Sequence, residues 1–247
     1  MTHEAPLPRQ LASRRLRVVR PRDAAQIYKA AKVEFARLAE AGLIIRLAHG
    51  YYAIPPTEAY GDPGWTPTVE DVAMGIGVAD YGPEASALSG VSAARHHGAM
   101  PRALSVGVVS VPVRRSPLIT AAGRVVFWTR RTDHLDTVRA KTELAWGYTT
   151  STEQTLLDLA NRPRLGGVSP RSISEAIWAL AGRADWDRTH RLSVDQQRPS
   201  AYARVIWVCA GLAPTDAPPA GPRRSPTKTL GLSSWGEASP AEFGLTP

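Results

Sequence analysis

The apolar positions near the start of the chain predict three short helices. One is expected over residues 7–16. A second is expected over residues 21–28, because the backbone angle of the proline at its first position suits the start of a helix. A third is expected over residues 31–41, where Phe35 and Leu38 recur at the three-residue spacing of a buried helix face.

Two strands are predicted directly after the third helix. Gly42 ends that helix, since glycine readily takes the left-handed conformation of a helix cap. The apolar runs 43–47 and 51–54 are then joined by the short turn 48–50, which ends on a glycine. Three helices and a hairpin in this order are typical of a winged helix-turn-helix, which we expect over about residues 7–55.

The pattern changes after residue 60. The turn-rich stretch 61–64 predicts a linker, and the residues that follow mix helical and strand-like patterns. Thr150 or Ser151 is expected to cap the helix that carries Glu153 in its first turn. The other predicted elements are helices at 69–78, 170–181 and 200–212, with strands at 105–111 and 124–128.

The predicted fold class is therefore α+β, with three regions. Residues 1–58 form the winged helix, and residues 66–213 form a mixed α/β domain with a helical C-terminal end. Residues 214–247 hold seven of the 21 prolines, and we expect this tail to be disordered. Apolar residues make up 43% of the chain and charged residues 21%, which indicates that the rest of the chain folds.

The positive charge is concentrated in the first region. The whole chain carries a formal net charge of +8, which favours a polyanionic partner. Residues 1–60 hold ten Lys/Arg and five Asp/Glu, whereas residues 61–213 hold seventeen and fourteen. Because the surplus coincides with the winged helix, double-stranded DNA is the expected partner.

The third helix is the element expected to enter the major groove. Arg37 is the candidate for a bidentate guanine contact, because its planar fork matches O6 and N7. Glu34 is a candidate acceptor for cytosine N4 or a group that repels wrong registers. The remaining candidate DNA contacts are Lys29 and Lys32 at the helix start, Arg46 and His49 on the hairpin, and the phosphate-positioning residues Arg14, Arg15, Arg17, Arg20 and Arg22.

Each of these charges also has a simpler interpretation. A lysine or arginine taken alone is more often a solvated surface charge than a base reader, and winged helices also serve as protein-binding modules. The pairs Arg114-Arg115 and Arg130-Arg131 end the two predicted strands. They suit edge charges that prevent strand aggregation, an extension of the DNA footprint, or contacts to an acidic partner protein.

The residue types that carry catalysis are sparse. Cys209, the single cysteine, lies in an apolar run and excludes an internal disulfide and a thiolate metal cluster. His96 and His97 are adjacent, so they diverge on a helix, and Glu153 and Asp158 are poorly aligned for a shared metal. We therefore expect no enzyme activity, no metal and no cofactor. A signal peptide and a bilayer-spanning run are also missing, so we expect a cytoplasmic protein with no membrane partner.

Three stretches resemble the AbiEi family, the antitoxin half of type IV abortive-infection toxin–antitoxin pairs, including its mycobacterial MenA type. They are "RLAHGYYAIP" at 46–55, "LSGVSAARHHGAMP" at 88–101 and "TTSTEQTLLDLANRP" at 149–163. The resemblance covers about residues 10–180. The chain departs from the family pattern at Gln154, where the family usually has arginine, and this puts any role of that arginine in doubt here.

The resemblance implies a repressor of its own operon, paired with a nucleotidyltransferase-type toxin that the C-terminal domain helps to neutralise. It also implies a structural role for Asp158. Two other functions fit the residues: a winged-helix regulator that senses a small ligand through its second region, and a DNA-targeted metal-dependent nuclease. A nucleotidyltransferase-like coding neighbour would favour the antitoxin, and Mg²⁺-dependent cleavage that needs Asp158 would favour the nuclease.

Overall fold

The computed structural model describes residues 9–62, 64–101 and 103–211, so the predicted tail at 214–247 lies outside the described residues. The chain forms two compact units, which are described separately. The first comprises the chain up to Leu88 together with Ala103–Asp133 and Val138–Thr149. The second comprises Ser89–Arg102, His134–Thr137 and the chain from Thr150 onward.

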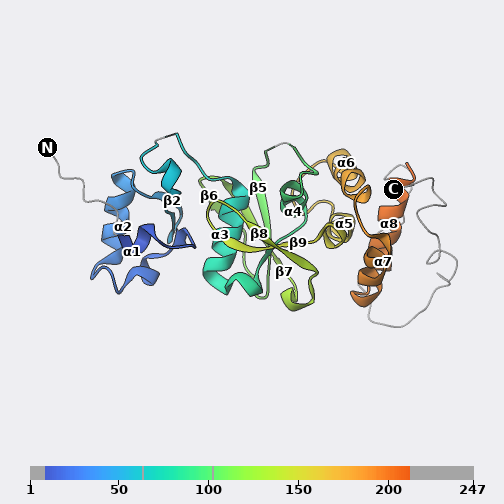
Figure 1. Cartoon of the computed structure of the whole chain (residues 1–247), viewed down its shortest axis with the longest axis horizontal. Coiled ribbons are helices and arrows are strands. Elements are labelled where there is room, and N and C mark those ends of the chain that lie inside the picture. The colour runs from blue at the N-terminus through green and yellow to red at the C-terminus, as the bar shows by residue number, and fades with distance from the viewer. Residues whose placement is uncertain (1–8, 63, 102, 212–247) are drawn as a thin grey trace. The chain divides into compact units, whose positions relative to one another are not determined.

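The first unit begins with a winged helix (Figure 1). Its three strands form an antiparallel sheet in the order β1-β3-β2, with β1 paired to β3 through Val18↔Ala53 and Val19↔Tyr52. This arrangement confirms the predicted α+β fold class with its N-terminal winged helix. The elements are α1 (Arg9–Ala12), β1 (Val18–Val19), a 3₁₀ turn (Pro21–Ala24), α2 (Ala31–Glu40), β2 (Ile45–Ala48) and β3 (Tyr51–Ala53).

Two of the three predicted helices are shorter than expected. The first ends at Ala12 instead of residue 16, because the chain must straighten to pair β1 with β3, and the Ile54 N–H donates to the Arg17 carbonyl over 2.8 Å. Part of the prediction, residues 7 and 8, lies outside the described residues. The second is a single 3₁₀ turn, in which the Asp23 carboxylate accepts a hydrogen bond from the Arg20 N–H over 3.2 Å.

The third helix and the hairpin are close to prediction. Helix α2 ends at Glu40, and Gly42 follows with a φ of +73°, the left-handed cap that the sequence indicated. Gly50 has a φ of +78° in the tight turn between β2 and β3. A bulge between Arg46 and Ala48 shifts the register of the hairpin. Such a bulge bends the strand that carries it, here β2.

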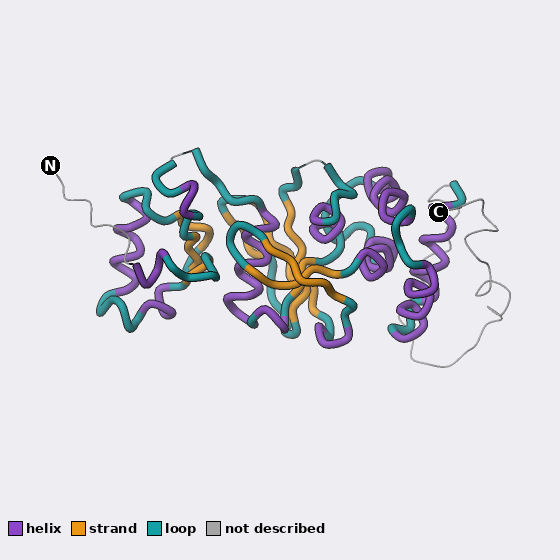
Figure 2. The backbone as a smooth tube through the Cα atoms, viewed as in Figure 1, coloured by secondary structure: helices purple, strands orange, loops and turns teal. Residues whose placement is uncertain are grey.

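The rest of the first unit is built on a mixed six-stranded sheet in the order β6-β7-β5-β4-β9-β8, drawn in orange in Figure 2. Strand β5 pairs in parallel with β7 and antiparallel with β4, while β6 closes one edge antiparallel to β7. The predicted strands at 105–111 and 124–128 are thus confirmed. The strands are β4 (Ala87–Leu88), β5 (Val106–Val111), β6 (Leu118–Thr120), β7 (Gly123–Thr129), β8 (Thr137–Lys141) and β9 (Trp146–Thr150).

Helix α3 (Val69–Tyr81) covers this sheet and also contacts the winged helix. Glycines allow the close approach: a Cβ at Gly107 would lie 2.7 Å from the Val69 carbonyl, and one at Gly75 would overlap the Val18 side chain. Val18, Leu47 and Ala53 therefore share one buried cluster with residues of α3, β5 and β7. The predicted boundary between residues 58 and 66 falls inside this unit, and separate folding of residues 1–58 stays a prediction.

The second unit is helical. Ser151 caps α5, accepting a hydrogen bond from the Gln154 N–H over 3.1 Å, so the second of the two predicted caps is the one used. Helix α7 was not predicted. The helices are α4 (Val91–His96), α5 (Thr152–Asn161), α6 (Pro170–Ala181), α7 (Trp186–Asp195) and α8 (Pro199–Cys209). None of the helices among the described residues is long and apolar enough to cross a membrane.

Candidate nucleic-acid interface

Helix α2 presents one exposed stripe and one buried face. Phe35 and Leu38 are buried, and the Phe35 ring meets the Tyr52 ring edge-on at a centroid distance of 5.2 Å. This contact fixes how the helix is rotated against the hairpin. The opposite positions of the helix follow each other at three- and four-residue intervals, and all are exposed: Lys32, Val33, Ala36, Arg37 and Glu40. Lys29 is also exposed and lies two residues before the helix begins at Ala31.

The cationic side chains of the stripe interact weakly or not at all with the rest of the described chain. Lys32 makes no hydrogen bond or ion pair with any residue that the structure describes. The Arg37 guanidinium lies 3.7 Å from the Glu34 carboxylate, at the outer limit of an ion pair, and its side chain is 63% exposed. Both groups are therefore available to an anionic partner, as the sequence-based interpretation requires.

Val33 was not among the predicted site residues. Its side chain is 65% exposed and lies in the middle of the cationic stripe. The signal was present in the sequence, because position 33 precedes Arg37 by four residues on the predicted helix. An apolar side chain at this place can contact the C5-methyl group of thymine in a major groove.

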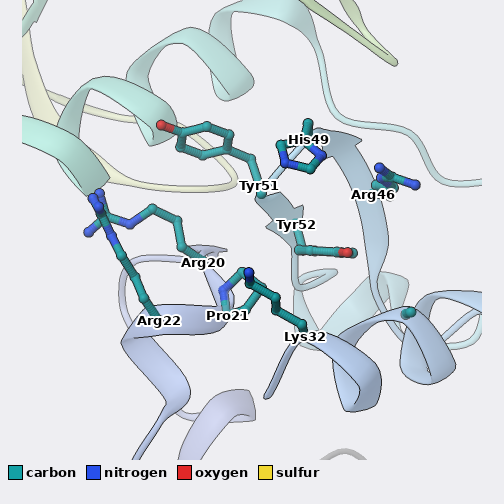
Figure 3. A pocket seen from close by; sticks show the side chains of 10 residues that line it. Arg20, Pro21, Arg22, Lys32, Arg46, His49, Tyr51 and Tyr52 are labelled. Carbon is teal, nitrogen blue, oxygen red and sulfur yellow. The ribbon is translucent and has the colours of Figure 1, made fainter. Parts of the chain in front are cut away.

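The hairpin adds Arg46 and His49, both exposed, and neither side chain bonds to any described residue. Together with α2 and the 3₁₀ turn they surround a cup with a volume of about 490 Å³. Figure 3 shows the side chains that line it, among them Arg22, Lys32, Arg46, His49 and Tyr52.

Several of the predicted phosphate-positioning arginines bind within the protein. Arg14 donates to the Asp23 carbonyl over 2.9 Å, and Arg17 donates to the Pro55 carbonyl over 2.8 Å. Arg20 pairs with the Asp23 carboxylate over 2.8 Å, and this hydrogen bond raises the pKa of Arg20. By contrast, the Arg22 side chain is 71% exposed. Arg15 is also exposed.

Asp80, near the end of α3, is the centre of a buried ionic cluster. Its side chain is 11% exposed and accepts hydrogen bonds from Arg20, from Arg115 and, over 2.7 Å, from the Tyr51 hydroxyl. Burial raises the pKa of Tyr51, and the hydrogen bond to Asp80 raises it further. The Arg115 guanidinium also lies 4.3 Å from the centre of the Phe127 ring. This cluster joins the winged helix to α3 and to the loop after β5.

The two basic pairs of the second region come together at one end of the sheet. They follow β5 and β7, which are parallel neighbours, and the Arg130 N–H donates to the Val111 carbonyl over 3.1 Å. The Arg130 guanidinium lies 4.2 Å from the centre of the Trp128 ring, and Arg131 pairs with Asp133 over 3.2 Å. Arg114 is exposed, whereas its neighbour Arg115 is held in the Asp80 cluster.

The histidine and carboxylate side chains considered as catalytic candidates each make a separate structural contact within the second unit. His97 Nε2 lies 2.7 Å from the Thr150 carbonyl. Glu153 accepts from the Asp185 N–H over 3.0 Å, while Asp158 accepts from the Gln154 side-chain amide over 3.0 Å. No group of His, Cys, Asp and Glu within the described ranges is arranged to hold a metal ion.

Comparisons with known proteins support the assignment of the N-terminal module. Residues 7–55 match the family described as "Transcriptional regulator, AbiEi antitoxin". No curated protein matches the chain. The fold resembles the crystal structure of the RV2827C protein from Mycobacterium tuberculosis, with a TM-score of 0.55 and 20% sequence identity, over 81% of this chain and 73% of that chain. At this identity the likeness shows the fold alone. The similarity to the AbiEi antitoxin family of transcriptional regulators thus covers residues 7–55, the part of the chain that forms the winged helix.

Proposed function

We propose that this protein is a double-stranded DNA-binding antitoxin that represses its own operon and neutralises a nucleotidyltransferase toxin. The observation that carries the DNA-binding part is the exposed stripe of α2. Its lysine and arginine side chains have weak or no bonds to described residues, and they lie on the helix that a winged helix inserts into the major groove. A location in the cytoplasm, where the chromosome lies, is part of the proposal, and the proposal assigns no catalytic residue.

Three side chains of α2 have chemistry suited to base edges: two lie on the stripe, and Glu34 lies beside it. Arg37 presents a guanidinium fork that matches guanine O6 and N7, and Glu34 stands 3.7 Å away, where it can orient the fork or accept from cytosine N4. Val33 offers an apolar contact to a thymine methyl group. The remaining exposed basic groups can contact backbone phosphates; they are Lys29, Lys32, Arg46, His49, Arg15 and Arg22.

The toxin-neutralising part rests on the family resemblance. The winged helix matches the antitoxin family over residues 7–55, and the similar stretches at 88–101 and 149–163 each begin at the end of a strand and continue into the second unit. We assign neutralisation to the residues after Thr68. The basic pairs at the end of the sheet are candidate contacts to an acidic toxin surface or to DNA.

The DNA-binding proposal is tested with the Lys32→Ala, Arg37→Ala double variant of the full chain. A duplex selected by the wild-type protein from a random 30-base-pair library (about three helical turns) serves as the probe in fluorescence anisotropy. We expect the affinity to fall by at least about tenfold, since one guanine contact alone contributes about 1–3 kcal/mol. The slope of log affinity against log salt should shrink by about one for the lost phosphate contact of Lys32.

The matched control is Arg171→Ala, because Arg171 is also an exposed arginine on a helix, 89% exposed and paired with Glu175. It should leave both the affinity and the salt slope unchanged. If the double variant also bound with wild-type affinity and salt slope, docking through α2 would be wrong.

The antitoxin part is tested by co-expressing the protein with the product of a nucleotidyltransferase-like coding neighbour. Rescue of growth is the expected result, and the double variant should also rescue, because its substitutions lie on the DNA-binding helix. Failure of the wild-type chain to rescue would refute neutralisation without affecting the DNA-binding result.

A further inference from the structure

The cup between α2 and the hairpin gathers cations from three elements. Arg22 comes from the 3₁₀ turn, Lys32 from α2, and Arg46 and His49 from the hairpin (Figure 3). No aspartate or glutamate is among the described residues that line it. The volume of about 490 Å³ lies in the range of pockets that hold small organic ligands and far exceeds the space that a lone phosphate fills.

Such a cluster is unfavourable without an anion. The side chains of Lys32 and Arg46 bond to no residue in the described part of the chain, and like charges in one place destabilise the folded state. The base of the cup is different, because the Arg20 charge is already balanced by Asp23 and Asp80. The arrangement therefore has a neutralised base and a rim on which Lys32 and Arg46 are unneutralised, while Arg22 lies at the outer limit of an ion pair with Asp80.

The remaining walls suit a sugar as well as a phosphate. Pro21, Ala36 and the tyrosines Tyr51 and Tyr52 contribute apolar surface. Tyr52 is 7% exposed and packs against Phe35, so its ring is fixed in place. A group with one anionic end and one carbon-rich end matches this combination of a cationic rim and a rigid aromatic wall.

We propose that the cup binds one sugar–phosphate unit of a DNA strand, with Lys32 and Arg46 on the phosphate oxygens. This inference rests on the proposed function, because DNA has to be docked along α2. A free nucleotide shares the same phosphoryl chemistry. The DNA backbone is the source we infer, since Lys32 belongs both to the cup and to the exposed stripe of α2, so a strand that follows the stripe reaches the cup.

The test replaces single phosphates of the selected duplex by neutral methylphosphonates, one position at a time, and measures binding of the full chain. One replacement should weaken wild-type binding by about tenfold, as expected for loss of a charge-assisted contact. In Lys32→Ala and in Arg46→Ala, binding should become insensitive to replacement of that same phosphate. Lys29→Ala is the matched control, an exposed lysine just before α2 that does not line the cup, and it should leave the sensitivity in place.

Three outcomes would overturn the inference, and they differ in what they say about the proposed function. If the wild-type chain binds the duplex but Lys32→Ala and Arg46→Ala lose sensitivity at different phosphates or at none, the shared site is refuted and DNA binding stands. If the wild-type chain binds no duplex, both proposals fail. If methylphosphonates have no effect while AMP raises the melting temperature of the wild type and not that of Arg46→Ala, the cup takes a free nucleotide instead of DNA.

Discussion

The winged helix has two basic faces that differ in how their charges are balanced. On the face toward α3, Arg20 and Arg115 are bound to the buried carboxylate of Asp80. On the outward face, Lys32 and Arg46 have no partner among the described residues. The difference shows that the position of carboxylates in the fold decides what a basic residue does. An arginine beside a carboxylate stabilises the folded state, and a lysine or arginine without one is available to bind DNA. Substitutions on the first face should alter unfolding, and substitutions on the second should alter DNA binding.

The largest expected effect is a loss of stability on the face toward α3. Asp80→Ala should lower the free energy of unfolding by about 3 kcal/mol, because it leaves Arg115 and the Tyr51 hydroxyl without their carboxylate acceptor and leaves Arg20 with Asp23 alone. Urea unfolding followed by circular dichroism measures the change. Arg22→Ala is the control: its side chain is 71% exposed and only 3.8 Å from Asp80, so it should cost less than about 0.5 kcal/mol. Equal losses in the two variants would break the comparison.

The packing between α3 and β1 gives the next largest effect. Gly75→Ala should cost about 2 kcal/mol, because the new Cβ overlaps Val18, a buried and β-branched side chain that cannot swing aside. Adding Val18→Ala removes the overlap, so the double variant should be more stable than the sum of the single losses predicts. Additive losses in urea unfolding would show that the two residues are not in contact.

A smaller effect is expected on the outward face. Replacing a contacted thymine by uracil in the selected duplex removes one methyl group, which should weaken wild-type binding about fourfold, from about 0.8 kcal/mol of lost apolar burial. Val33→Ala should bind the thymine and uracil duplexes equally, with unchanged unfolding. A uracil effect that persists in Val33→Ala would assign the thymine contact to another residue.

The smallest effect concerns acid pH. Burial raises the pKa of Asp23, but the hydrogen bond and charge of Arg20 outweigh it, and the folded-state pKa lies below the ordinary value of about 4. The stabilisation is therefore present above about pH 4 and is lost as the pH falls through the lowered pKa. The gap in unfolding free energy between wild type and Asp23→Asn should be under about 1 kcal/mol near neutrality and should shrink below pH 4. A gap that grows in acid would contradict this linkage.

Local signals in the sequence were enough to predict several elements. Helix α6 has the predicted bounds, because Ser169 and Pro170 mark its start and its apolar positions repeat regularly. Gly42 and Gly50 marked the end of α2 and the hairpin turn. Strand β1 was missed because it is two residues long and is defined by its pairing with β3, which no local pattern encodes.

The candidate site was predicted less completely, for a related reason. The sequence was enough to predict that Lys32, Arg37 and Arg46 are exposed. The helical period and the hairpin turn that determine their exposure depend only on neighbouring residues. The pairing of Arg20 with Asp80 joins residues sixty positions apart, so it depends on the tertiary fold. Val33 was not predicted as a site residue because it carries no charge, although its place in the stripe follows from the same helical period.

The Ala121 N–H of the turn after β6 donates to the Leu47 carbonyl of β2 over 2.8 Å. With the Tyr51 hydroxyl held by Asp80, the hairpin is anchored on both of its strands before any partner arrives. Its conformational entropy is thus lost when the chain folds and not when it associates, which is the condition under which a small contact area yields a usable affinity. The direction in which Arg46 and His49 project is accordingly a property of the six-stranded sheet as much as of the hairpin itself.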